Sequence, residues 1–205
     1  MSGQLRTGSQ TGIMINRDLK RCLGQMMKGV QVVAATHDDV TRAYTSHWVC
    51  QVSFDEPVLM ASVSPKHDTH PLIAGSGRFA VSILAGDQVE PGQYFSYPGH
   101  RFRYVADEWI ADADGWPVVP DALAWLGCEV EDRIVGRYDH DLFFARVVAF
   151  GEGRLGEAPL LYSSRHGWRV GGEPAREKGE SVRDRLTARV EARFGPGSPG
   201  VANAP

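Results

Sequence analysis

The sequence predicts a mainly β protein, a small antiparallel barrel with a few helices. Short extended candidates recur along the chain, at Val30–Thr36, Tyr44–Ser53, Val58–Ser64, Phe79–Leu84, Leu126–Val135 and Leu142–Phe150. Turns rich in Asp, Gly and Pro separate these segments, which is typical of hairpin-connected strands. Helices do not alternate regularly with them, as they would in repeating βαβ units. An antiparallel barrel is therefore favoured over a parallel sheet.

The chain of 205 residues is most simply one domain with tails. Residues 1–16 are rich in Gly, Ser, Thr and Gln without periodicity, which predicts a flexible N-terminal tail. Residues 17–170 carry the extended candidates and form the predicted barrel domain. Gly171, Gly172 and Pro174 mark a break, so residues 171–205 are predicted to form a linker, an amphipathic helix and a disordered end.

Two helices are predicted from apolar spacing. Near the N-terminus, an i, i+3, i+4, i+7 pattern predicts a core-facing helix that ends at Gly29; the apolar residues are Leu19, Cys22, Leu23, Met26 and Met27. Near the C-terminus, i+4 steps predict an amphipathic helix whose apolar positions are Val182, Leu186, Val190 and Phe194. Acidic residues are interleaved with the arginines of that second helix, so a solvated face is favoured over a nucleic-acid surface.

The composition favours a small-molecule partner. The net charge of −3 and the pI near 6.2 give no general attraction to nucleic acid or to an anionic membrane. No apolar run is long enough to span a bilayer, and the polar start lacks the apolar core of a signal peptide, so a cytoplasmic location is expected. Cys22, Cys50 and Cys128 are odd in number and far apart, which predicts buried free thiols rather than disulfides.

The segment Ala43–Ile73 carries the strongest chemical signal. Two extended stretches joined at Asp55–Pro57 run into a turn that opens a short helix at Thr69, with Asp68 or Thr69 as its cap. Backbone N–H groups at strand ends can meet the edge of a flat ring, while hydroxyls, a cation and a helix N-terminus can hold a phosphate. From periodicity alone, an ordinary strand with Trp48 in the core is the favoured interpretation of Thr45–Trp48.

Two other patterns are better explained as structure. Gly151–Gly156 matches the G-x-G-x-x-G dinucleotide motif, but an extended apolar run follows it instead of a helix, so a turn between strands is predicted. His67 and His70 could be combined with Asp139, His140 and Asp141 as metal ligands, but their spacing lacks a rigid metal-binding pattern, and no metal site is predicted.

Four blocks in order give the chain a resemblance to the flavin reductase family over roughly residues 17–170. They are Asp18–Val30, the Ala43–Ile73 segment with its Val-Ser-Phe-Asp-Glu-Pro stretch, Gly77–Leu84, and the pair Ala122–Val130 and Tyr138–Phe144. Glu56 and Tyr138 depart from the family pattern, in which proline and glycine are usual. The resemblance implies an FMN-binding split β-barrel with an N-terminal helix, and a homodimer.

The resemblance also implies an activity and a site. The activity is that of an NAD(P)H:flavin oxidoreductase serving a partner oxygenase of a two-component monooxygenase, with FMN (or FAD) as flavin and NADH or NADPH as co-substrate. His140 is the implied catalytic residue beside the nicotinamide, and the implied flavin-binding residues are Thr45, Ser46, His47, Trp48, Ser62, Val63, Ser64, Lys66, His67 and Thr69. Two alternatives stay open: an enzyme whose tightly held flavin acts on an organic substrate, and a flavin-binding protein without turnover.

Overall fold

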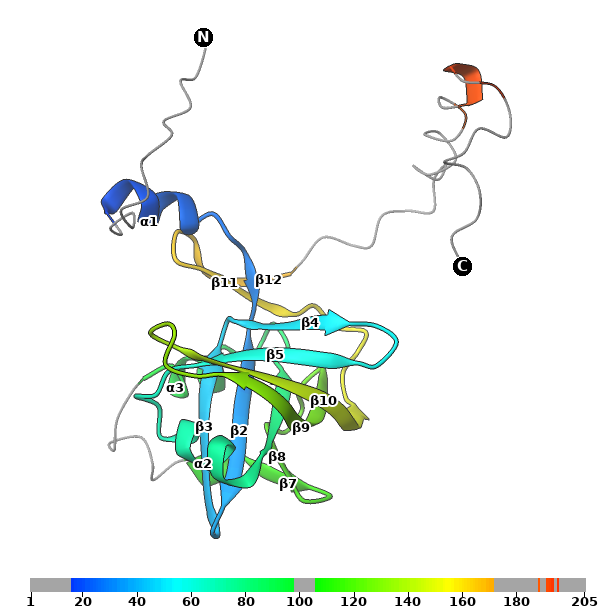
Figure 1. The fold of residues 1–205 in the computed structure, drawn as a ribbon. Helices are drawn as coiled ribbons and strands as arrows, with labels where there is room; N and C mark the ends of the chain where they lie inside the picture. Colours follow the sequence, from blue (N-terminus) through cyan, green and yellow to red (C-terminus); the bar gives the residue numbers. More distant parts are fainter. Residues whose placement is uncertain (1–15, 98–105, 172–187, 189–190, 194, 196–205) are drawn as a thin grey trace. The chain divides into compact units, whose positions relative to one another are not determined.

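The structure is a computed structural model that describes residues 16–97, 106–171, 188, 191–193 and 195 (Figure 1). The chain divides into two compact units, Met1–Gly171 and Gly172–Pro205. The apolar positions of the predicted C-terminal helix lie outside the described residues, as does the predicted tail before Asn16. Within the described ranges, no helix combines the length and the apolar character needed to cross a membrane.

A seven-stranded antiparallel sheet dominates the first unit. Its strands are β2 (Gln31–His37), β3 (Val40–Ser46), β4 (Val49–Ser53), β5 (Val58–Val63), β6 (Arg78–Ile83), β9 (Ala124–Ile134) and β10 (Asp141–Glu152). Their order in the sheet is β3-β2-β6-β9-β10-β5-β4. The predicted mainly β fold is confirmed, and the segment predicted as one strand over Tyr44–Ser53 is divided into two strands at His47 and Trp48.

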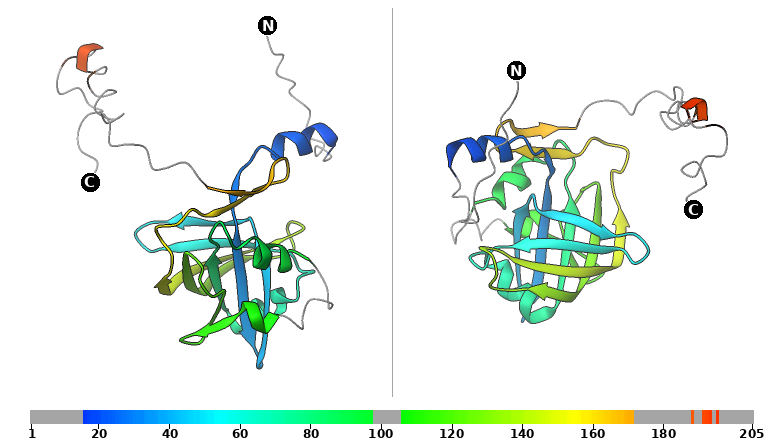
Figure 2. Two further views of the ribbon diagram at one scale, coloured as in Figure 1. Left: turned by 180° about the vertical axis from the view of Figure 1, so that it is seen from behind. Right: turned by 45° about the horizontal axis from the view of Figure 1, so that its top comes forward.

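The positions of β3 and β4 force this sheet to curl. The two strands are consecutive in the chain, yet they lie at opposite edges of the sheet. Only His47 and Trp48 separate Ser46 from Val49, and three Cα–Cα steps reach at most about 11 Å. The two edges must therefore meet at this connection, which makes the sheet a split barrel. Figure 2 shows β4, β5 and β10 crossing over β2 and β3.

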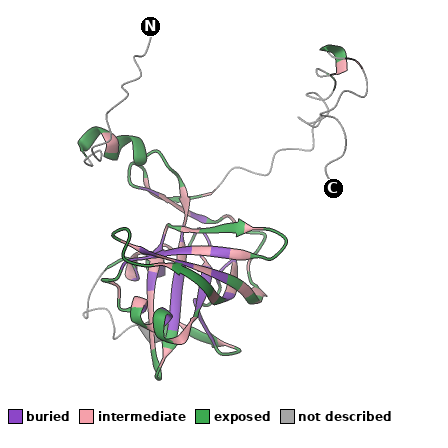
Figure 3. Cartoon of the chain, in the orientation of Figure 1, coloured by how far each residue is buried: buried purple, intermediate pink, exposed green. Residues whose placement is uncertain are grey.

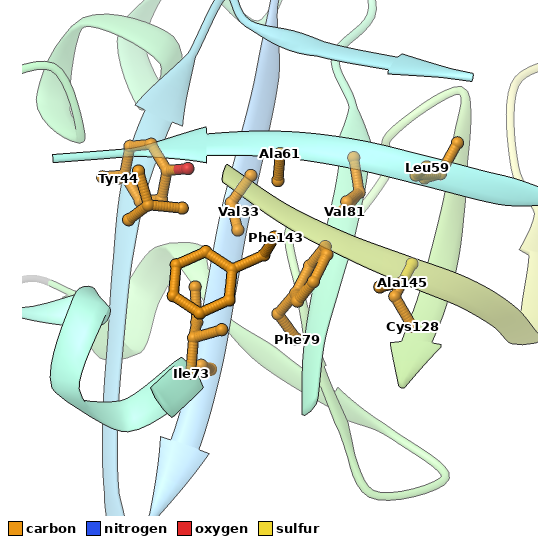
Figure 4. Packing of buried hydrophobic residues seen from close by; sticks show 12 residues of the cluster. Val33, Tyr44, Leu59, Ala61, Ile73, Phe79, Val81, Cys128, Phe143 and Ala145 are labelled. Atoms are coloured by element: carbon orange, nitrogen blue, oxygen red, sulfur yellow. The ribbon is translucent and has the colours of Figure 1, made fainter. Parts of the chain in front are cut away.

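The inside of the curled sheet holds the main core (Figure 4). Phe79 and Phe143 are each 1% exposed, and Tyr44, Val33 and Ile73 pack with them. Figure 3 shows this buried interior under an exposed outer surface. Helix α2 (Thr69–Ser76) contributes Ile73 and ends at Gly77, whose φ of 66° is the left-handed conformation that glycine adopts without strain. The short helix predicted to open at Thr69 is therefore present.

Smaller elements complete the first unit, and of these the sequence analysis predicted only the extended run after Gly156, which overlaps Leu160–Ser163. A three-stranded sheet consists of β1 (Lys28–Gly29), β11 (Leu160–Ser163) and β12 (Gly167–Val170). It packs with α3 (Val89–Tyr94) over a second core that includes Val32, Leu84 and Phe95. A hairpin of β7 (Ala111–Ala113) and β8 (Trp116–Val118) follows α4 (Ala106–Trp109). Asp114 and Gly115 both have positive φ in its turn, as a type I′ hairpin requires.

The N-terminal helix corrects one prediction. Helix α1 (Arg17–Leu23) begins at Asn16, whose side chain accepts a hydrogen bond from Leu19 N, and it ends at Gly24 instead of Gly29. It contains no buried residue, and Met26 beyond it is 56% exposed. The predicted core-facing helix is wrong, because apolar spacing defines a face but does not supply a surface to cover it.

The cysteine prediction is correct for one residue of three. Cys128 is a buried free thiol in the main core, whereas Cys22 and Cys50 are exposed free thiols. Cys50 lies on β4, an edge strand, where a residue surrounded by apolar neighbours in sequence still faces outward.

Candidate functional site

The connection between β3 and β4, hereafter the seam (residues 46–49), is fixed by hydrogen bonds on both sides. The Ser46 hydroxyl accepts from Trp48 N at 3.1 Å, and Trp48 O accepts from Ser62 N of β5 at 3.0 Å. Ser46 is 4% exposed and also bonds Tyr44, so it supports the seam from inside the core. The backbone of Trp48 is thereby held, while its indole is 50% exposed.

Thr45 precedes the seam and is tied to α3. Its hydroxyl donates to Gly92 O at 2.6 Å, and its N–H donates to Phe95 O at 3.0 Å. The hydroxyl proton is therefore used within the protein, and only the oxygen lone pairs remain for a ligand.

The turn between β5 and α2 lies directly beside the seam. Ser64 organises it, because its hydroxyl accepts from Lys66 N at 3.3 Å and its carbonyl oxygen accepts from His67 N at 3.0 Å. Lys66 is exposed, whereas Thr69 is 1% exposed. The expected side-chain cap of α2 is not formed by Asp68, which occupies the N-cap position with helical backbone angles.

Three aromatic or imidazole side chains gather where the seam, this turn and the start of β10 meet. The rings of Trp48 and His140 touch edge to face, with centroids 4.9 Å apart. The His67 ring stacks on Tyr44 at 4.6 Å, and it lies near enough to His140 for that histidine to help lower the His67 pKa. We call Trp48, His67 and His140 the ring surface. The register of β10 with β5, which pairs Asp141 with Val63, brings His140 to this place.

The histidines of the site differ in their electrostatic surroundings. Burial lowers the pKa of His67 below its usual value, and the neighbouring His140 and His70 add to this effect while Asp68 opposes it. Burial also lowers the pKa of His47, with Lys28 adding to the effect. Both rings are therefore neutral near pH 7. Lys66, not His67, is the cation of the turn that suits a phosphate.

His47 faces a second aromatic group. Its ring stacks on Tyr162 of β11 with centroids 4.3 Å apart, and it meets Trp168 of β12 edge to face at 5.9 Å. The β1–β11–β12 sheet is thereby joined to the seam. Tyr162 is not among the site residues predicted from sequence, and this stacking is its contact with the seam.

The predicted site residues thus form two groups. Buried residues support the site from within, and they are Ser46, Ser62, Val63, Ser64 and Thr69. Exposed or half-buried residues can meet a ligand, and they are Thr45, His47, Trp48, Lys66, His67 and His140. Side chains alternate between the two faces of a strand, but the sequence does not say which face is covered. The curling of the sheet determines that face, and with it which site residues are buried.

Two residues of this region were not assigned to the site from sequence. Asp141 is buried and lies 2.7 Å from His70 Nε2, so these residues pair with each other across α2 and β10. Across the described residues, no group of three or more His, Cys, Asp or Glu side chains is arranged to hold a metal ion. The sequence analysis had considered His70 and Asp141 only as possible metal ligands.

The dinucleotide-like motif lies elsewhere. Gly151 and Glu152 complete β10, and the turn to β11 follows them as predicted. Arg154 holds that turn through two hydrogen bonds to the Asp87 carboxylate, at 2.8 and 2.6 Å.

Hollows lined by described residues also lie away from the ring surface. One of about 390 Å³ lies between the β2–β3 hairpin and the β7–β8 hairpin, and another of about 390 Å³ lies between α2 and the end of β9. Neither contains a predicted site residue, so the assignment of the site rests on its chemistry and not on a hollow.

A curled antiparallel sheet whose two edges meet at one connection defines a split-barrel protein, and the ring surface with the neighbouring Lys66 turn is its candidate site. Residues 23–169 match the model of the flavin reductase like domain. The chain belongs to this family, as the sequence resemblance indicated.

Relatives and solved structures agree with this family. The chain is 30% identical over 136 residues to a probable flavin reductase of Rhizobium meliloti (strain 1021), covering 65% of this chain but only 43% of that protein. It is 33% identical over 145 residues to the NADH-dependent flavin reductase StyB of Pseudomonas fluorescens, covering 67% and 81%. The styrene monooxygenase flavin reductase from Pseudomonas putida S12 superposes with a TM-score of 0.68 at 26% identity, covering 77% and 99%.

Proposed function

We propose that the protein is an NADH-dependent flavin reductase that uses FMN and supplies reduced flavin to an oxygenase of a two-component monooxygenase. The observation that carries the proposal is the meeting of the seam, the Lys66 turn and His140 at one ring surface. The similarity to StyB, named as NADH-dependent, supports the choice of NADH over NADPH.

The residues present fit FMN. His140 Nδ1 and His47 Nδ1 are buried polar atoms without a hydrogen bond, and a ligand could satisfy them. Asp139 Oδ1 lies 3.2 Å from His140 Nδ1, but the angle does not make a hydrogen bond. Lys66 and the Thr69 N–H at the start of α2 would hold the phosphate, since His70 N already donates to His67 O and Pro71 has no N–H.

The contribution of the protein to the reaction is orientation. Bound FMN supplies the hydride-accepting ring, whose chemistry belongs to the cofactor. His47 and Trp48 would border the flavin, and His140 would orient the nicotinamide next to it. Holding two reactants in register is worth up to about 7–11 kcal/mol of the barrier. No side-chain nucleophile is needed for this step.

NADH oxidation with added free FMN under anaerobic conditions tests the proposal. Each protein molecule is expected to reduce many molecules of free FMN, with one NADH consumed for each FMN reduced. Reduction of one equivalent only would favour the enzyme with tightly held flavin. Flavin binding without any NADH oxidation would favour the flavin-binding protein without turnover, and absence of FMN binding would exclude all three.

A homodimer is part of the same proposal. β4 is an edge strand, and the turn after it exposes Phe54 at 89%. Val147 N donates to Pro57 O, so this turn lies beside β10, where Phe150 is 70% exposed. Exposed apolar side chains beside an edge strand are typical of an interface.

Sedimentation of the protein with Phe54→Lys and Phe150→Lys tests the dimer. The double variant should be monomeric where the parent is dimeric. Leu155→Lys, which changes another exposed apolar residue, is the matched control and should leave the dimer intact. A monomeric parent protein would disprove the homodimer.

A further inference from the structure

Asp141 is a buried carboxylate whose oxygens are both used within the protein. Its side chain is 3% exposed. Oδ1 accepts a hydrogen bond from Gly136 N at 2.8 Å, and Oδ2 accepts one from His70 Nε2 at 2.7 Å. The hydrogen bond from Gly136 is the main cause that lowers the Asp141 pKa, with His70 and Arg133 contributing and burial opposing. A buried carboxylate is stable only with such partners.

These two hydrogen bonds connect three elements. His70 lies in the first turn of α2, Gly136 lies in the turn between β9 and β10, and Asp141 is the first residue of β10. The ring of His70 is itself held, because its other contact is edge to face with Phe143 of the main core at 5.5 Å. The β9–β10 turn is thereby attached to a rigid helix.

The attached turn ends in His140. Residues 135–139 are exposed, so they have little packing of their own to fix the turn. Gly136 has a φ of 67°, a conformation that a side chain would strain. Asp141 follows His140 directly, so its two hydrogen bonds fix the backbone from which the His140 ring reaches Trp48.

We propose that His70 and Asp141 are positioning residues for the nicotinamide half of the reaction: their pair anchors the β9–β10 turn on α2 and sets the face that His140 presents beside Trp48. This inference rests on the proposed flavin reductase function. It assigns no chemical step to either residue, because both lie behind the ring surface.

The first test is the rate of FMN reduction by NADH, measured by anaerobic stopped-flow. His70→Leu should slow reduction at low NADH by between about 10- and 100-fold, as expected when an orienting group is displaced. FMN affinity should stay close to that of the parent, since Lys66 and the seam are unchanged. His70→Gln keeps a side-chain N–H donor and should recover most of the loss.

His37→Leu is the matched control. His37 also lies beside an aspartate, Asp38, at 3.6 Å, and its ring packs against Gly75 of the same helix α2. This variant should reduce flavin at the parental rate, because it leaves the β9–β10 turn untouched.

The double variant His70→Leu with His140→Ala separates positioning from general damage. If His70 acts through His140, the double variant should be slower than His140→Ala alone by no more than about twofold, since residues of one unit are not additive. If the rate loss of the double variant instead equals the product of the two single-variant losses, the proposal would be overturned.

Nuclear magnetic resonance of the protein without NADH gives a readout besides activity. In the parent, the His140 ring protons should show the shift caused by the Trp48 indole, and His70→Leu should remove it. Unchanged His140 resonances would overturn the proposal. An inactive parent protein whose His140 resonances do respond would instead contradict the proposed function and leave the anchoring of the turn in place.

Discussion

In the proposed function, different residues at the ring surface contact the flavin and the nicotinamide. Lys66 is exposed on the turn that Ser64 holds, and it is suited to the phosphate of FMN. His140 lies on the other side of Trp48, where it can meet a second ring. Because these contacts come from different elements, substitutions should separate flavin binding from flavin reduction.

Lys66→Ala should weaken FMN binding but not riboflavin binding, because only FMN carries the phosphate. One charge-assisted contact is worth about 1.5–3 kcal/mol. Isothermal titration with both ligands measures this difference. Lys20→Ala on α1 is the control for loss of a surface charge. Equal losses for FMN and riboflavin would show that Lys66 does not contact the phosphate.

His140→Ala should slow flavin reduction by NADH about 10- to 100-fold, which corresponds to about 1.4–2.7 kcal/mol, while FMN affinity stays nearly intact. Asp139→Asn removes the carboxylate 3.2 Å away but keeps the ring, and it should have a small effect. Anaerobic stopped-flow measures both variants. Loss of FMN affinity instead would place His140 in the flavin half of the site.

At the level of elements, the seam joins the two edges of the sheet and places the site on that junction. Its geometry depends on hydrogen bonds made by the buried hydroxyls of Ser46 and Tyr44. Ser46 bonds the Trp48 N–H, and Tyr44 donates to Ser62 O across the interior at 3.3 Å. Binding and stability are therefore linked at the seam.

Ser46→Ala should lower both stability and FMN affinity. The Trp48 N–H would lose its acceptor, and an unsatisfied buried donor costs about 1–3 kcal/mol. Chemical denaturation and flavin titration measure the two effects. Ser76→Ala removes a hydroxyl bonded to Leu72 O at the far end of α2, and it should lower stability without changing FMN affinity. Unchanged flavin affinity in Ser46→Ala would mean that the seam does not border the flavin.

The stability of the whole molecule should depend on pH through the half-buried His47 and His67. The pKa values of His47 and His67 are lowered from 6.5 in the folded protein. Below pH 6.5 the unfolded chain takes up protons that the folded protein does not, so stability should fall as pH falls through and below this value. Each group contributes at most about 1.4 kcal/mol per pH unit.

Urea denaturation between pH 7.5 and 5 measures this slope, and His47→Gln with His67→Gln should reduce it. His37→Gln is the control on another strand end. Asp141 affects stability in a separate, more acidic pH range. Its pKa is lowered from 3.8, so its contribution to the free energy of unfolding is lost only as pH falls below that value. A slope that persists in the double variant would mean that other groups cause it.

The sequence by itself determined the extended segments, the helix that opens at Thr69 and the family, whereas the residues of the candidate site stay a prediction. These features are local, because a strand or a turn is encoded by neighbouring residues. The exposure of α1 and of Cys50 could not be determined in this way, since the same apolar pattern fits a covered and an uncovered face.

Only the tertiary structure decided that β3 and β4 lie at opposite edges of one sheet and meet at the seam. The closure of the sheet buries residues that support the site from within, such as Ser62, and leaves residues that could contact a ligand exposed, such as Trp48. It also pairs His70 with Asp141, which are 71 residues apart in the chain. Partners so distant in sequence are chosen by the register and curl of the sheet, and no local pattern records that choice.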